Sequence, residues 1–176
     1  MVNQPGGSPV TLESWTADQL CKSDLVVVAS FNRQVSGLTQ DNGLVISDYY
    51  VTIEQQLYSR NGGTTLLPGS SLVVNGLGGS TVLTEGRAST TVAGATAFQR
   101  GMLYLLFLKS IPGDSDFELT DLGGAFILKP GENPVNTYRL TQNKLKSYLS
   151  ALDSNALVNT VRLMATTAPS CKESGR

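Results

Sequence analysis

The chain contains no histidine, and this absence excludes several kinds of active site. Without an imidazole there is no Ser-His-Asp triad, no Cys-His dyad and no zinc site with a histidine ligand. The two cysteines, Cys21 and Cys171, are too few for a zinc site made of four thiolates. No serine stands in a Gly-x-Ser-x-Gly elbow or a Ser-x-x-Lys box, so nucleophilic serine chemistry has no motif either.

Charged side chains of both signs are also scarce. They make up 15% of the chain and leave a formal net charge of −1, whereas a typical soluble domain is roughly 25% charged. The 13 basic residues are scattered along the sequence. Because binding to nucleic acids and to anionic lipids requires clustered Lys and Arg, we expect neither kind of partner.

Long hydrophobic runs are missing as well. The longest covers residues 102–108, far below the ~18–20 apolar residues that cross a bilayer. Residues 1–10 carry neither the basic nor the apolar region of a signal peptide. We therefore expect no membrane insertion, and the protein is either cytosolic or the mature form of an exported one.

The composition and the two cysteines bear on that choice. Ser, Thr, Gly and Asn are abundant and charges are few, a balance typical of secreted β-rich proteins. Cys21 and Cys171 lie near opposite ends of the chain. They either form a disulfide that ties the tail to an amino-terminal helix, or are two unrelated thiols. A disulfide would place the protein outside the cell, in a periplasm or on a cell surface.

The order of the predicted elements indicates a single domain over 11–165, between a flexible leader (1–10) and a polar tail (166–176). Successive strands with Gly and Pro turns, and no helix between them, favour an antiparallel sheet or barrel. Helical spacing is confined to the two ends of the domain. We predict helices over 11–21, over 140–152 with Thr141 as N-cap, and from Ser154 onward, with strands over 25–31, 45–58, 71–77, 81–85, 102–108, 117–120 and 125–129.

Two of these strands differ in their pattern. Apolar and polar residues alternate over 45–58, which predicts one face in the core and one in water. The segment 102–108 is apolar on both faces, so we expect the barrel interior to cover one face and a helix the other. The residues assigned to these surfaces are Val45, Tyr49, Val51, Ile53 and Leu57 for the core face of 45–58, and Leu145, Tyr148, Leu149 and Leu152 for the covering helix.

A glycine-rich stretch, residues 76–81, resembles a dinucleotide-binding loop only superficially. It lacks the last glycine of that motif, and no helix follows to hold a pyrophosphate. We interpret it as a β-turn or bulge and expect no cofactor.

Several segments together resemble the small secreted β-barrel domains of bacteria, whose function is mostly unknown. They are KSDLVVVA at 22–29, the turn LPG at 67–69, FQRGMLYLLFL at 98–108 and GGAF at 123–126. Such domains are similar in layout to the OB-like barrels of the netrin and metalloproteinase-inhibitor group. The resemblance implies a mainly β fold with flanking helices (α+β), namely an OB-like barrel with a short amino-terminal helix and a carboxy-terminal helix or helix pair. It implies no catalytic residue, and the inhibitors' cysteine framework is missing.

Two sets of residues are candidates for binding. Asp114, Asp116 and Glu118 would project from one face of a strand and could hold a calcium ion, or they are solvated acids at a hairpin. Tyr50 and Tyr58 lie opposite the core face, with Glu54 between them. Exposed aromatic rings on a barrel can stack on sugars, although half-buried packing is the alternative.

The absence of a catalytic constellation favours a non-catalytic binding or interaction module over an enzyme. Its partner would be a protein or a carbohydrate. One alternative is a glycosidase-like hydrolase that uses acids such as Glu54, Asp116 or Glu118, provided that two carboxyls converge in a cleft. Another is a structural component of an envelope.

Overall fold

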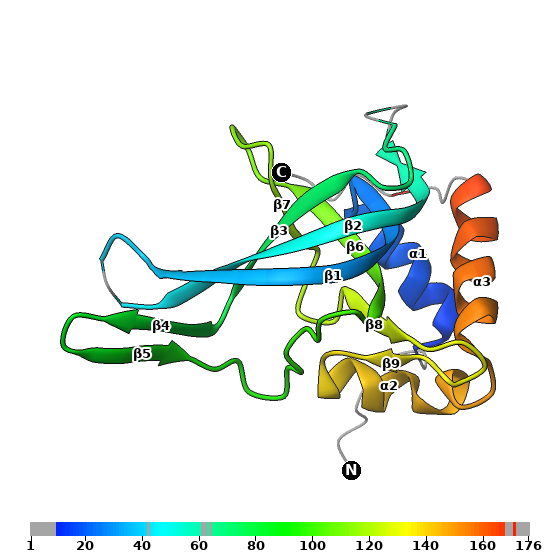
Figure 1. Ribbon diagram of the computed structural model, residues 1–176. Helices are drawn as coiled ribbons and strands as arrows, with labels where there is room; N and C mark the ends of the chain where they lie inside the picture. Colours follow the sequence, from blue (N-terminus) through cyan, green and yellow to red (C-terminus); the bar gives the residue numbers. More distant parts are fainter. Residues whose placement is uncertain (1–9, 42, 61–62, 64, 168–170, 172–176) are drawn as a thin grey trace, which may run out of the picture.

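The computed structural model describes residues 10–41, 43–60, 63, 65–167 and 171. Nearly all of the predicted leader and most of the predicted tail lie outside these residues. The fold is mainly β, with one helix before the strands and two after them (Figure 1). No helix within the described ranges is long and apolar enough to span a bilayer. The elements are α1 (Leu12–Lys22), β1 (Leu25–Leu38), β2 (Val45–Ser59), β3 (Ser71–Leu77), β4 (Gly79–Leu83), β5 (Gly86–Thr90), β6 (Leu103–Ser110), β7 (Phe117–Leu119), β8 (Ala125–Leu128), β9 (Val135–Asn136), α2 (Arg139–Leu149) and α3 (Ser154–Thr166).

Five strands close into a barrel in the order β1-β2-β3-β7-β6, and β6 pairs back onto β1. All of these pairs are antiparallel except β3–β7, which is parallel and aligns Val74 with Phe117. The short strands β8 and β9 extend the sheet beyond β6. The structure thus confirms the predicted β-barrel, with one helix before its strands in the sequence and a helix pair after them.

The strand β6 is buried on both faces, as predicted. Leu106 and Leu108 belong to the core inside the barrel, whereas Leu105 and Phe107 belong to a second core beneath the helices. Leu145 and Leu149 of α2 cover that outer face, and both are buried. Helices α1 and α3 complete the cover with Leu12, Leu20, Leu157 and Val161.

The disulfide between Cys21 and Cys171 is present and joins the last turn of α1 to the tail. Its Cα atoms are 5.3 Å apart, across a sequence separation of 150 residues. A capping box between Thr11 and Ser14 starts α1, because each side chain bonds the other's backbone N–H. The described residues contain no free cysteine.

Several predicted boundaries were wrong. The strand predicted to end at 31 continues to Leu38, because β2 pairs with its polar half. Helix α2 starts at Arg139 after Tyr138, which makes no side-chain cap bond, so Thr141 is not the N-cap. Register shifts between β1 and β2 move Leu57 off the barrel face, and it packs under the helices instead.

The outer half of the β1–β2 hairpin and the β4–β5 hairpin project from the barrel together (Figure 1). A small polar cluster holds them at their base. Gln34 Nε2 donates to Ser47 Oγ at 2.8 Å, and Ser47 Oγ donates to the Gly78 carbonyl at 2.5 Å. Gly79, at φ +119°, leaves no room for a Cβ beside the Ser47 hydroxyl. Glycine is therefore required where the hairpins cross.

Candidate functional site

The predicted calcium ligands do not converge. The Asp114 carboxylate accepts a hydrogen bond from the backbone N–H of Asp116, in its own loop, at 3.2 Å. Glu118 is instead paired with Lys109, at 3.0 Å between Nζ and Oε1. Across the described part of the chain, no three acidic, cysteine or histidine side chains are grouped closely enough to hold a metal ion.

The predicted aromatic platform is also divided. Tyr50 lies under the guanidinium of Arg33, which is 4.0 Å from the ring centroid. Tyr58 packs against the core beneath the helices, on the other side of the β1–β2 register shifts. Glu54 accepts a hydrogen bond from Ser30 at 3.0 Å. Tyr50 and Tyr58 thus lie in different surroundings, and a binding site at these residues stays a prediction.

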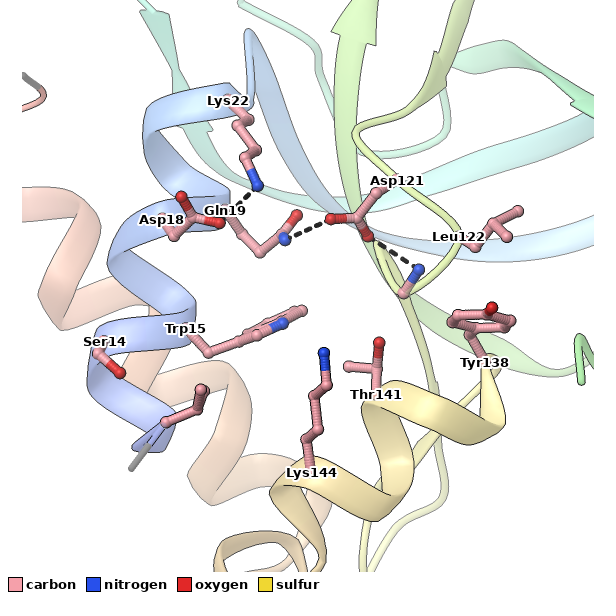
Figure 2. Close-up of a pocket in the computed structure, with 12 residues that line it drawn as sticks. Ser14, Trp15, Asp18, Gln19, Lys22, Asp121, Leu122, Tyr138, Thr141 and Lys144 are labelled. Atoms are coloured by element: carbon pink, nitrogen blue, oxygen red, sulfur yellow. Dashed lines mark hydrogen bonds and ion pairs between the residues drawn. The ribbon is translucent and has the colours of Figure 1, made fainter. Parts of the chain in front are cut away.

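A pocket of about 510 Å³ lies instead between α1, α2 and the loop from β7 to β8 (Figure 2). Trp15 reaches across it from α1, Lys144 and Thr141 enter from α2, and Asp121 approaches from the loop. Tyr138, just before α2, forms the far wall. The volume is within the usual range for small-molecule sites, which is roughly 300–1,000 Å³.

Gln19 fixes the distance between α1 and the loop. Its side chain is 1% exposed, and its amide donates to Asp121 Oδ2 at 2.8 Å and accepts from Thr120 Oγ1 at 2.5 Å. The other oxygen of Asp121 accepts from the Gly123 N–H at 2.8 Å. Because both polar atoms of the buried Gln19 side chain have partners on the loop, the pocket wall is held in one arrangement.

Gly123 brings the loop against α2. A Cβ added there would collide with Thr141 Oγ1 and would lie 3.0 Å from Thr141 Cβ. The glycine is buried. The absence of a side chain at this position is thus what lets two walls of the pocket meet at its base.

Trp15 is held by two rings of the core beneath the helices. Its indole stands edge-on to Phe107, at 5.4 Å between centroids, and edge-on to Phe126, at 5.3 Å. T-shaped contacts of this kind orient a ring as well as bury it. The part of the indole that faces the pocket is therefore presented in a fixed orientation.

The charged groups at the pocket balance. Lys22 Nζ is 2.6 Å from Asp18 Oδ2, on one turn of α1. Asp121 and Lys144 add one negative and one positive group from the loop and from α2. Within the described residues, Lys144 has no ion pair, and the side chains of Trp15, Tyr138 and Thr141 make no hydrogen bond to the protein.

The site therefore offers an indole N–H, two hydroxyls and an ammonium as open donors or acceptors, and a carboxylate with unused lone pairs. This set can bind a polar molecule through several hydrogen bonds but forms no nucleophile–base pair. The sequence pattern did not single out Trp15, Gln19, Asp121 or Lys144 as site residues. The predicted helix over 11–21 did place Trp15 on a helix, as the structure has it. The chain matches no family model, and no curated protein shows significant sequence similarity to it.

Proposed function

We propose that the protein is a non-catalytic carbohydrate-binding module that works outside the cytoplasm, and that the pocket at Trp15 holds one uncharged sugar unit. The observation that carries this proposal is the fixed indole at the edge of a pocket with open hydrogen-bonding groups. A sugar ring has apolar C–H faces and a rim of hydroxyls, so it suits an aromatic side chain flanked by donors and acceptors.

The charge balance supports an uncharged ligand. Two acidic and two basic side chains line the pocket, and one pair already neutralises itself between Lys22 and Asp18. An anionic ligand would approach Lys144 but also Asp121, and a cationic ligand would meet the same conflict. Hydroxyl groups can donate to Asp121 and accept from Lys144 without such repulsion.

The disulfide supports the proposed location outside the cytoplasm. Disulfides persist in oxidising compartments and are rare in the cytosol. A bond between Cys21 and Cys171 therefore fits a protein of an extracellular space, a periplasm or a cell surface better than a cytosolic one.

A hydrolase is the less favoured alternative. Glu54, Asp116 and Glu118 line no common pocket, and Glu118 is held by Lys109. At the Trp15 pocket, Asp18 is ion-paired and Asp121 is committed to Gln19 and Gly123. Both carboxylates are therefore engaged by other protein groups, and neither stands free in an apolar setting as a general acid would.

Trp15 is the only tryptophan of the chain, so its fluorescence reports on this pocket alone. We expect glucose, galactose, mannose or N-acetylglucosamine, or short oligomers of them, to change the emission at millimolar concentration, and glucuronate to bind more weakly than glucose. Lys144→Ala should weaken binding about tenfold, which corresponds to about 1.4 kcal/mol. The matched control is Lys146→Ala, on the same helix but outside the pocket.

Three results would contradict the proposal. They are no change in emission or heat with any sugar of the panel, equal losses in Lys144→Ala and Lys146→Ala, and release of reducing ends from an oligosaccharide. The last would instead support the hydrolase.

A further inference from the structure

A second hollow of about 370 Å³ opens at one end of the barrel, on the other side of the β7–β8 loop from the Trp15 pocket. Its walls come from β2, β3, β7 and the segment 92–98. Asp121 and Leu122 line both hollows, so this loop is the partition between them. The side chains that give the second hollow its apolar surface are Tyr49, Val74, Leu77, Val92, Phe98 and Leu119.

The floor of this hollow is a rigid aromatic cluster. Phe98 is 4.8 Å from Tyr49 and 4.6 Å from Tyr104, measured between ring centroids. Tyr49 lies over Gly76, where a Cβ would be 2.8 Å from the ring atom Cε2. Glycine at this position therefore lets the Tyr49 ring pack closely against β3.

The outer wall is fixed by backbone bonds. The Thr96 N–H donates to the Thr137 carbonyl at 2.7 Å, and the Arg139 N–H donates to the Gly94 carbonyl at 2.8 Å. Ala95 also forms a β-bridge with Tyr138. A wall held in this way does not need to be ordered when a ligand enters, which lowers the entropy cost of binding.

The mouth of the hollow exposes two leucines. Leu77 and Leu122 are 47% and 46% exposed, and both line the opening. A ligand that covers these exposed apolar side chains removes apolar surface from water, which favours binding. This favours an apolar occupant over a sugar.

The charged groups at the hollow are already bonded to other protein groups. Lys109 and Glu118 form an ion pair at 3.0 Å. Among the described residues Asp121 has no ion-pair partner, but its two oxygens accept hydrogen bonds from Gln19 and from the Gly123 N–H. A charged occupant would lose its hydration without gaining a free partner of opposite charge, which favours an uncharged occupant.

We infer that this hollow is a second binding site, which takes a small uncharged molecule with an aromatic or compact apolar body. The site is separate from the proposed sugar pocket, because its aromatic floor and the walls from β2, β3 and the segment 92–98 come from other residues, and only the β7–β8 loop lines both. Ligand pockets of this kind recur in the mouths of β-barrels.

The test uses benzyl alcohol as the uncharged probe, with benzoate and benzylamine as charged probes of similar size. Binding is followed by the backbone amide resonances of the disulfide-bonded protein. We expect benzyl alcohol to shift the amides of Gly76, Val92, Ala97 and Leu119, and the charged probes to bind at least tenfold more weakly. Ala97→Trp should weaken binding at least tenfold, because Ala97 is exposed and a large side chain there fills the hollow.

The matched control is Ala93→Trp, which places the same ring on the same segment outside the hollow and should leave binding unchanged. If Ala97→Trp does not fold, Thr96→Trp fills the hollow from the neighbouring position and should have the same effect. The inference is overturned if shifts occur elsewhere or not at all, if charged and uncharged probes bind equally, or if a folded filling variant binds as well as the control. A failure of the sugar titration at Trp15 would leave these outcomes unaffected.

Discussion

Gly123 and Thr141 touch so closely that a single methyl group on Gly123 would displace the Thr141 side chain. We therefore expect Gly123→Ala to lower the free energy of unfolding by about 1–3 kcal/mol, the usual cost of overpacking a buried contact. Urea unfolding measures this loss. Thr141→Ala in the same chain removes the colliding hydroxyl and methyl and should restore part of it. Additive losses in the double variant would show that the contact is not the cause.

The hydroxyl of Thr16 is buried on α1 and has no hydrogen-bond partner among the residues that the structure describes, and the residue is 0% exposed. Thr16→Val keeps the shape and removes the unsatisfied polar atom. We expect it to raise the free energy of unfolding by about 1 kcal/mol. The control is Thr160→Val, where the hydroxyl donates to the Ala156 carbonyl at 2.9 Å, so the same change should not stabilise. Destabilisation by Thr16→Val would mean that the hydroxyl has a partner in solution.

Leu106 points into the barrel from β6 and is 0% exposed. Leu106→Asp would bury a carboxylate without a partner, and we expect the protein to unfold under native conditions. Circular dichroism and the melting temperature provide the measurement. The matched control is Leu163→Asp on α3, where the leucine is 67% exposed, and this variant should melt as the wild type does. A folded Leu106→Asp protein with a near-normal melting temperature would disprove the burial of β6 on both faces.

The Cys21–Cys171 bond closes a loop of 150 residues. In the chain-entropy model this restricts the unfolded chain by about 5 kcal/mol, which is an upper figure. We expect Cys21→Ser/Cys171→Ser to unfold at a clearly lower urea concentration than the oxidised protein. Wild-type protein with reductant should behave like the double variant, whereas the double variant itself should not respond to reductant. Equal midpoints for the oxidised wild type and the variant would contradict the expectation.

Burial raises the pKa of Tyr104 and of Tyr49 above the ordinary tyrosine value of 10.0. The unfolded chain then loses these protons at lower pH than the folded protein. Above pH 10 the unfolded state therefore binds fewer protons, and stability falls as the pH rises toward the raised values. Urea unfolding across this pH range should show the fall in the free energy of unfolding, and the Tyr49→Phe/Tyr104→Phe variant should show a smaller fall. An unchanged slope in that variant would assign the effect to other groups.

The parts of the fold that follow from local pattern were predictable. The unbroken apolar run of β6 implied two covered faces, and the period of the later segments implied the helices that cover one of them. Leu145 and Leu149 accordingly lie in that second core. The disulfide was one of two alternatives, because two cysteines near the chain ends say nothing about their separation in space.

Tertiary pairing decided what the pattern could not. Residues 32–38 are mostly polar and were not predicted as a strand, yet pairing with β2 makes them one. The register shifts between β1 and β2 then separate Tyr50 from Tyr58, which a regular alternation would place on one face. A bulge has no distinct sequence signal in this segment.

The candidate pocket was beyond the sequence for the same reason. The bond from Gln19 to Asp121 joins residues 102 positions apart, and Lys144 comes from a third element. No spacing rule connects them, because only the folded barrel brings α1, the loop and α2 together.

The Cys21–Cys171 bond also sets the path that mechanical force takes through the molecule. Tension applied through chain on either side of the two cysteines passes across the disulfide and does not load the barrel, which lies within the loop. The residues between the two cysteines, roughly 500 Å of chain at about 3.3–3.6 Å per extended residue, therefore cannot be pulled out while the bond is intact. Of the regular elements only α1, which begins before Cys21, is loaded. Because Trp15 and Gln19 lie on that helix, a stretching force would disturb the pocket at Trp15 before any strand of the barrel separates.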